Sequence, residues 1–201
     1  MRQPSGVILA GGLALRLGGG DKGLLPLDGP TILDHVIDRL GPQVAGLALS
    51  ANGDPARFAR LGLPVLPDSM PGHPGPLAGV LAGLDWAAGR GDEAIVTAAA
   101  DTPFLPEDLV PRLLLAAETA GAPIALAATP DGRHPTFGLW PVALRDDLRA
   151  ALAQGTRKVT DWADRHGAAT ALFPDGPFDP FFNVNTPDDL ARARALAAGG
   201  R

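Results

Sequence analysis

The feature that most constrains this chain is an apolar run of strand length that ends in a glycine-rich loop. The run covers residues 7–10, and the loop after it contains six of the 26 glycines together with Arg16 and Lys22. Glycine lets backbone N–H groups approach an anion closely, and the two cations neutralise its charge. Since an ordinary turn needs only one or two glycines, this loop favours phosphate binding over a plain flexible turn.

Two common glycine motifs do not fit the loop. The Walker loop needs Gly-Lys followed by Ser or Thr, and the sequence contains no Gly-Lys. Gly18, Gly20 and Gly23 match the dinucleotide pattern G-x-G-x-x-G. However, the expected strand ends eight residues before Gly18, and Pro26 disfavours the helix that should follow. We therefore expect a phosphate loop of another kind.

The composition predicts one α/β domain over residues 1–201. A hydrophobic content of 46% argues against disorder, and the absence of cysteine excludes disulfides and thiolate chemistry. The net charge of −5 argues against a nucleic-acid partner. No apolar run reaches membrane-spanning length and no signal pattern is present, so we expect a cytoplasmic monomer with no membrane partner.

Strand-like and helix-like patterns alternate along the chain. We expect strands at residues 5–10, 44–50, 63–66, 93–99, 123–128, 134–140, 168–173 and 181–185. We expect helices at residues 31–40, 55–61, 105–120, 142–153, 159–165 and 186–197, and another that starts at Pro76. At the start of the first helix, Thr31 and Asp34 fit a variant of the capping box. This alternation predicts a mostly parallel sheet with helices on both faces. Ligands bind such sheets at the carboxyl ends of the strands, so the polar residues that follow the strands should share one site.

Asp101 and the pair Asn183 and Asn185 are the polar residues of most interest. Asp101 follows a strand of small and apolar residues, where a carboxylate suits Mg²⁺. A turn or helix-capping aspartate explains it equally well, and the phosphate loop favours the metal. Two asparagines two positions apart in a strand point to the same face, with Val184 opposite, toward the core. They can bind a ligand or complete a metal shell, although Asn185 also fits a turn.

Asp68 lies in a stiff, proline-rich loop after the third expected strand. Its carboxylate can accept hydrogen bonds from two adjacent N–H donors, such as those of guanine, and it is also compatible with an ordinary loop aspartate. No nucleophile–base pair is apparent in the sequence. A phosphate group that attacks a nucleotide α-phosphorus is already largely anionic, with a second pKa of about 6. Such a reaction needs mainly positioning, cations and Mg²⁺.

Five motifs, in order along nearly the whole chain, resemble those of molybdenum cofactor guanylyltransferases of the MobA type. They are Leu9-Ala10-Gly11-Gly12 with Arg16 and Lys22, Pro74-Gly75-Pro76-Leu77-Ala78-Gly79, Asp101-Thr102-Pro103, His134-Pro135-Thr136, and Asn183-Val184-Asn185-Thr186-Pro187. The resemblance implies a Rossmann-like nucleotidyltransferase fold. It also implies Mg²⁺-dependent transfer of GMP from GTP to the terminal phosphate of molybdopterin, with release of pyrophosphate.

The resemblance also assigns roles by position. It implies nucleotide contacts at Leu9, Ala10, Gly11, Gly12, Lys22, Asn52, Asp68 and Asp101. It implies catalytic roles for Arg16, Lys22 and Asp101, with Asp101 holding Mg²⁺, and pterin contacts at Asn183, Asn185 and His134. The implied partners are GTP, molybdopterin and other proteins that handle the molybdenum cofactor.

Three alternatives remain. A cytidylyltransferase acting on the same pterin is the closest, but such relatives tend to read Leu-Ala-Ala-Gly, so Gly11 beside Gly12 favours guanine. A sugar-phosphate nucleotidyltransferase is a more distant match. A non-catalytic carrier of the cofactor with the same fold would not need Lys22 and Asp101, because it has no departing pyrophosphate to neutralise.

Overall fold

The protein is described by a computed structural model that covers residues 2–11, 21–27, 29–70, 72, 75–174 and 178–199. Seven strands within these ranges form one sheet in the order β3-β2-β1-β4-β6-β5-β7. The strands are β1 (Ser5–Leu9), β2 (Leu47–Ser50), β3 (Val65–Leu66), β4 (Ala94–Ala99), β5 (Ala125–Thr129), β6 (Gly132–Pro141) and β7 (Ala169–Leu172). In this sheet β6 pairs antiparallel with β4 and β5, while the other pairings are parallel. The predicted mostly parallel sheet is confirmed.

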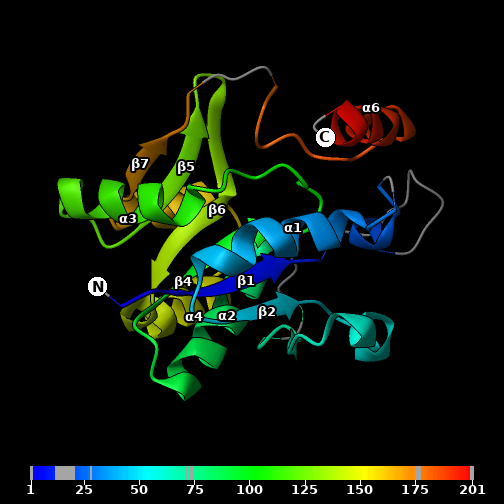
Figure 1. The fold of residues 1–201 in the computed structure, drawn as a ribbon. Coiled ribbons are helices and arrows are strands. Elements are labelled where there is room, and N and C mark those ends of the chain that lie inside the picture. The colour runs from blue at the N-terminus through cyan, green and yellow to red at the C-terminus, as the bar shows by residue number, and fades with distance from the viewer. Residues whose placement is uncertain are drawn as a thin grey trace.

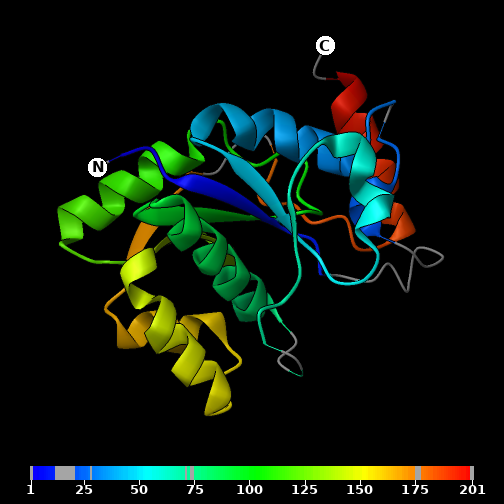
Figure 2. The ribbon, with the colours of Figure 1, turned by 90° about the horizontal axis from the view of Figure 1, so that it is seen from below.

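Helices cover both faces of the sheet (Figures 1 and 2). One face carries α1 (Ile32–Leu40) and α3 (Leu109–Ala120), and the other carries α2 (Pro76–Arg90), α4 (Arg145–Ala153) and α5 (Val159–Arg165). Short 3-10 helices cover Lys22–Leu24, Gly41–Gln43, Pro55–Leu61 and Val142–Leu144. The last helix, α6 (Pro187–Gly199), lies against the segment after the glycine loop, where Arg194 donates hydrogen bonds to the carbonyl of Pro26. No helix in the described parts of the chain has the length and apolar character required to span a bilayer.

Neighbouring residues in the central strands point to opposite hydrophobic layers. In β1, Val7 packs in the layer under α2, while Ile8 packs in the layer under α1 and α3. In β4, Ile95 and Val96 divide in the same way. These strands are buried on both faces, which explains why they read as nearly continuous apolar runs in the sequence.

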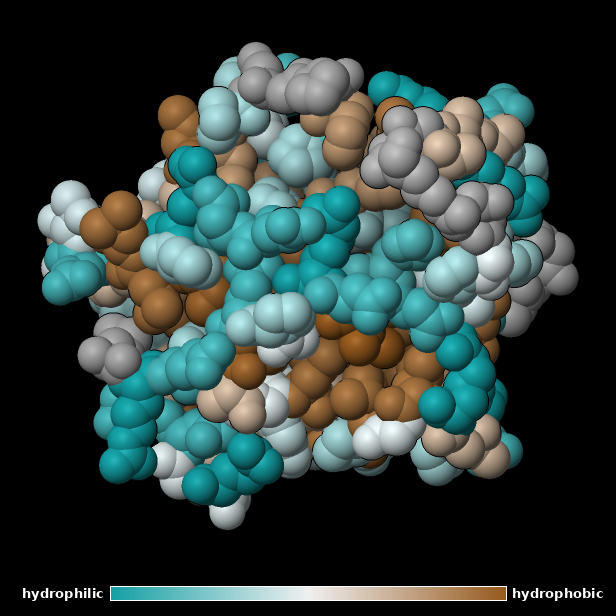
Figure 3. All heavy atoms as spheres, viewed as in Figure 1, coloured by the Kyte–Doolittle hydropathy of each residue, from teal (hydrophilic) through white to brown (hydrophobic). Residues whose placement is uncertain are grey.

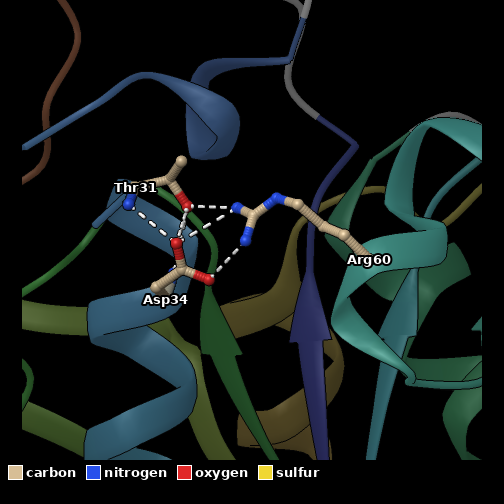
Figure 4. A network of polar contacts seen from close by, with 3 residues as sticks. All are labelled: Thr31, Asp34 and Arg60. Carbon is tan, nitrogen blue, oxygen red and sulfur yellow. Dashed lines mark hydrogen bonds and ion pairs between the residues drawn. The ribbon is translucent and has the colours of Figure 1, made fainter. Parts of the chain in front are cut away.

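The start of α1 is fixed by the capping box that the sequence predicts. The backbone N–H of Asp34 donates to the Thr31 hydroxyl, and Asp34 accepts from the Thr31 backbone N–H. Arg60, from the 3-10 helix Pro55–Leu61, donates to both side chains and so joins that helix to α1 (Figure 4). The outer surface of α1 is hydrophilic, and hydrophobic side chains are exposed beside it, near β2 (Figure 3).

Two glycines let α2 lie directly on the sheet. A Cβ atom at Gly79 would come within 2.8 Å of side-chain atoms of Leu9 and Ser50. A Cβ atom at Gly83 would come within 2.8 Å of Val7 and Ile95. This close contact fixes the N-terminus of α2 near the carboxyl ends of β1 and β2.

Residues 181–185, which we expected to form a strand, form none. Both edges of β4 are already paired, one with β1 and the other with β6, so no ladder position is open beside it. The segment crosses the end of β4 instead, where the Val184 N–H donates to the Asp101 carbonyl. Val184 is fully buried, as expected from the alternation of the segment.

Two other boundaries differ from the predictions. The helix expected from residue 105 begins at Leu109, after a turn in which the Leu109 N–H donates to the Pro106 carbonyl. The strand expected at residues 134–140 runs from Gly132 to Pro141 and pairs with β5 as a hairpin. A connection of two residues between Thr129 and Gly132 permits only antiparallel pairing, which explains the reversed direction of β6.

Candidate functional site

A cavity of about 410 Å³ opens at the carboxyl ends of β1, β2, β3 and β4. Its lining combines the end of the glycine loop, the segments after three strands and the first turns of α2. The lining residues are Leu9, Ala10, Gly11, Asp21, Lys22, Gly23, Leu33, Ser50, Ala51, Asn52, Phe58, Asp68, Gly75, Pro76, Gly79, Ala99, Ala100, Asp101, Thr136 and Asn183. The strand topology thus brings together residues that are far apart in the sequence, as predicted for an α/β sheet.

Most of the residues implied for nucleotide binding line this cavity. They are Leu9, Ala10, Gly11, Lys22, Asn52, Asp68 and Asp101. Gly12 and Arg16 lie outside the described residues. The described residues that were expected to contact the nucleotide therefore lie around one cavity.

Lys22 is the link between the glycine loop and two other parts of the cavity. Its Nζ donates to Oδ2 of Asp101 at 2.7 Å and to Oδ1 of Asn185 at 2.6 Å. The Lys22 side chain is only 14% exposed. An ammonium group has three N–H donors, so these two contacts leave a third donor for an anionic ligand.

The C-terminal segment is tied to the turn after β4 at two points and to Lys22 at a third. Thr102, fully buried, donates from its hydroxyl to Oδ1 of Asn183. Val184 is bound through its N–H to the Asp101 carbonyl, and Asn185 contacts Lys22. Burial of Val184 therefore fixes the asparagines on either side of it, and Asn183 lines the cavity while Asn185 reaches the lysine.

Asn52 and Asp68 form a reciprocal pair in another part of the cavity wall. The Asn52 amide donates to Oδ2 of Asp68 at 2.7 Å, and the Asp68 backbone N–H donates to Oδ1 of Asn52 at 2.9 Å. One carboxylate oxygen of Asp68 is thus engaged, and the pair presents acceptors in a fixed orientation. This geometry suits recognition of a flat hydrogen-bonding group such as a nucleobase edge.

His134 is not among the cavity-lining residues, whereas Thr136 from the same strand is. The His134 ring stacks on Phe181 with ring centroids 4.3 Å apart, and its Nε2 lies 3.1 Å from the Thr129 hydroxyl. The pKa of His134 lies below its usual value, because the effect of burial outweighs the opposite effect of Asp179 and Asp131. Its described contacts therefore support the packing of the C-terminal segment on β6.

Asp101 offers the donor chemistry that a hard cation requires. Its Oδ2 accepts from Lys22, while Oδ1 has no hydrogen-bond partner within the described ranges, and the residue lines the cavity. Across the same ranges, no three His, Cys, Asp or Glu side chains cluster as metal ligands. Coordination by one carboxylate, ligand phosphates and water is typical of Mg²⁺ in proteins.

Several cavity residues were not predicted from the sequence. Asp21, Ser50 and Phe58 line the cavity, together with Gly75 and the following turn of α2. Ser50 ends β2, so the rule that strand ends meet at one edge could have found it. Phe58 reads as a core residue, and its position in the wall depends on the folding of the 3-10 helix Pro55–Leu61.

Comparison with known proteins assigns the chain to a family. The family model for the MobA-like NTP transferase domain matches residues 6–169 of this chain. The chain belongs to the MobA-like NTP transferase family. This result confirms the resemblance seen in the five motifs and, with it, the nucleotidyltransferase fold.

Relatives within the MobA-like family match over nearly the whole chain. The molybdenum cofactor guanylyltransferase of Mesorhizobium japonicum is 54% identical over 200 residues, covering 97% of this chain and 96% of that protein. The protein of the same name from Cereibacter sphaeroides is 58% identical over 192 residues, covering 95% of each. The structure of molybdopterin-guanine dinucleotide biosynthesis protein A from Archaeoglobus fulgidus has a TM-score of 0.75 at 26% identity, covering 97% of this chain and 99% of that one.

Proposed function

We propose that this protein transfers GMP from GTP to the terminal phosphate of molybdopterin and releases pyrophosphate. The observation that carries the proposal is the position of Lys22, which bridges Asp101 and Asn185 in a cavity of nucleotide size. The names of the relatives at 54% and 58% identity support the choice of guanine and of the pterin.

The reaction requires little acid–base chemistry from the protein. A phosphate oxygen of the pterin forms a bond to the α-phosphorus of GTP, and the bond from that phosphorus to the bridging oxygen of pyrophosphate breaks. The attacking phosphate is already largely anionic near neutral pH, with a second pKa of about 6. The remaining N–H donor of Lys22 is suited to neutralise charge on the leaving pyrophosphate, and the Asn183 segment is suited to position the second substrate.

The proposal includes Mg²⁺, held by Asp101. Bound there, the ion would neutralise charge on the triphosphate. Asp101 is positioned for this role by the end of β4, and Lys22 fixes its carboxylate through Oδ2. Among the described residues, the second wall of the cavity, with Asn52 and Asp68, is the place for the base.

The proposal is tested by offering the purified protein GTP, CTP and ATP with molybdopterin and Mg²⁺. We expect pyrophosphate release and a guanine dinucleotide product with GTP, and much slower reaction with CTP and ATP. A clear preference for CTP would instead support the cytidylyltransferase alternative. Nucleotide binding without any pyrophosphate release would support the carrier.

The metal assignment is tested by Asp101→Asn, which keeps the size of the side chain and removes its charge. We expect at least a 100-fold loss of GMP transfer, a typical cost of removing one charge-stabilising group. We also expect Mn²⁺ binding to be lost, which electron paramagnetic resonance in the presence of GTP measures. Asp108→Asn, an exposed carboxylate at the start of α3, serves as the control. Mn²⁺ binding equal to wild type in Asp101→Asn would contradict the assignment.

A further inference from the structure

Arg57, which no sequence motif marks, is held by three different acceptors beside the cavity. Its Nε donates to Oδ2 of Asp21 at 2.6 Å. Its two terminal nitrogens donate to the backbone carbonyls of Asp54 and Asn52, each at 2.5 Å. The guanidinium carbon also lies 4.4 Å from the ring centroid of Phe58. The planar guanidinium, with its donors in fixed directions, therefore binds three acceptors at the same time.

The acceptors of Arg57 belong to two separate parts of the nucleotide cavity. Asp21 lines the cavity and directly precedes Lys22, which contacts Asp101. Asn52 lines a second wall, where its side chain is paired with Asp68. Arg57 itself is not among the described lining residues, and its hydrogen bonds to Asp21 and Asn52 join these two parts of the cavity.

The charge of Asp21 gives this contact a second consequence. Its carboxylate is only 16% exposed and lies in a cavity proposed to bind a triphosphate, where an uncompensated negative charge would repel the ligand. The ion pair with Arg57 offsets this charge. Among the described lining residues, it leaves Lys22 as the cation that faces the ligand.

We propose that Arg57 is a positioning residue that couples base recognition to triphosphate contact. The guanidinium holds the segment with Asp21 and Lys22 at a fixed distance from the turn with Asn52. A shift of either wall would misplace the base relative to the phosphates. Placing GTP in the cavity rests on the proposed function, whereas the bracing of the two walls by Arg57 does not depend on any transfer reaction.

The experiment compares Arg57→Ala with Arg60→Ala. Arg60 lies in the same 3-10 helix and forms an ion pair with Asp34, away from the cavity lining (Figure 4). GTP and CTP binding is measured by calorimetry, transfer kinetics are measured with GTP, and melting temperature reports stability. In Arg57→Ala we expect kcat/KM for GTP to fall by roughly 10- to 100-fold, because small misplacements of this kind are costly. The GTP-to-CTP affinity ratio should also fall, while Arg60→Ala changes neither quantity.

Two further variants separate geometry from charge. Arg57→Lys keeps the charge but lacks the planar fork of donors. We therefore expect its GTP-to-CTP affinity ratio to be as low as that of Arg57→Ala. Asp21→Asn combined with Arg57→Ala should reduce kcat/KM no further than Arg57→Ala alone, because Arg57→Ala has already removed the contact that Asp21→Asn breaks.

Three outcomes would overturn the inference. They are a GTP-to-CTP affinity ratio in Arg57→Ala equal to that in Arg60→Ala, a wild-type affinity ratio in Arg57→Lys, or a further loss of kcat/KM in the double variant. Failure of the wild type to bind GTP at all would instead overturn the proposed function. If the wild type binds GTP but releases no pyrophosphate, the comparison of affinities still tests Arg57.

Discussion

Lys22 combines two properties that are rarely found together in a surface loop. It follows the glycine-rich loop, and yet its ammonium group is mostly buried between Asp101 and Asn185. These partners come from the turn after β4 and from the segment before α6, 79 and 163 residues away in the sequence. The position of this one cation therefore depends on the packing of three separate parts of the chain.

Lys22→Ala tests whether this cation serves the reaction or only the fold. We expect GMP transfer to fall by about 100- to 1,000-fold, as when a single charge-stabilising donor is removed. We expect the melting temperature to change little, because the lysine lies outside the three hydrophobic clusters. Lys158→Ala, at the other lysine of the sequence and on the exposed surface before α5, is the control. Parallel losses of activity and stability in Lys22→Ala would indicate a structural role.

The helix α2 depends on close contact with the sheet. Gly83→Ala would bring a methyl group within 2.8 Å of Val7 and Ile95 at the centre of a packed layer. We expect a destabilisation of about 1–3 kcal/mol, the usual cost of overpacking. Urea denaturation measures this difference.

Gly89→Ala provides a matched control on the same helix, because a Cβ atom at Gly89 meets no atom within 4 Å. We expect this substitution to stabilise the protein by roughly 0.5–1 kcal/mol through helix propensity. Equal effects of the two substitutions would show that helix propensity, and not contact with the sheet, decides the outcome.

The capping box of α1 makes a pH-dependent contribution to stability. Partial burial raises the pKa of Asp34, but the hydrogen bonds from Arg60 and Thr31 outweigh it, so the net pKa lies below its usual value. A lowered folded-state pKa stabilises the protein above the unfolded-state pKa, and this stabilisation is lost as the pH falls through the folded-state pKa.

Asp34→Asn should therefore cost about 1 kcal/mol at pH 7, as typical for a lost cap. The difference from the wild type should narrow as the pH falls below about 4, near the unfolded-state pKa of aspartate. Denaturation curves between pH 7 and pH 3 measure it, with Asp38→Asn, on the exposed side of α1, as the control. A difference that stays constant over this range would show that the charge of Asp34 is not responsible.

The whole molecule shows which features the sequence could predict. The β1 strand, the capping box at Thr31 and the helix after Pro76 follow from patterns within a few residues, and they are confirmed. The candidate site could be predicted as far as strand ends share one edge of a sheet, which brought together Leu9, Asn52 and Asp101.

Contacts between distant segments could not be predicted. Residues 181–185 have the alternation of a strand, but whether they pair depends on β4 having an open edge, which only the complete sheet order determines. The partner of Arg57 is Asp21, 36 residues earlier, and no local pattern distinguishes this arginine from Arg60. Such choices depend on the packing of the whole chain.

The C-terminal segment contacts both the turn after β4 and the segment after the glycine loop. The Val184 N–H is bonded to the Asp101 carbonyl, and Arg194 donates to the Pro26 carbonyl. Val184 and Ala193 are fully buried in one cluster with Leu27. Since the sheet is also continuous, we expect residues 1–201 to unfold as a single cooperative unit.

Tryptophan fluorescence and GTP together test this cooperativity. The three tryptophans, Trp86, Trp140 and Trp162, belong to the layer under α2, α4 and α5, and none lines the cavity. GTP at 100 times its Kd should stabilise the protein by about 2.7 kcal/mol. In a single cooperative unit, the fluorescence and far-UV circular dichroism transitions coincide and GTP shifts both equally. If GTP shifts the circular dichroism transition but leaves the fluorescence transition in place, the two layers unfold independently, and the contacts of Val184 and Arg194 do not couple them.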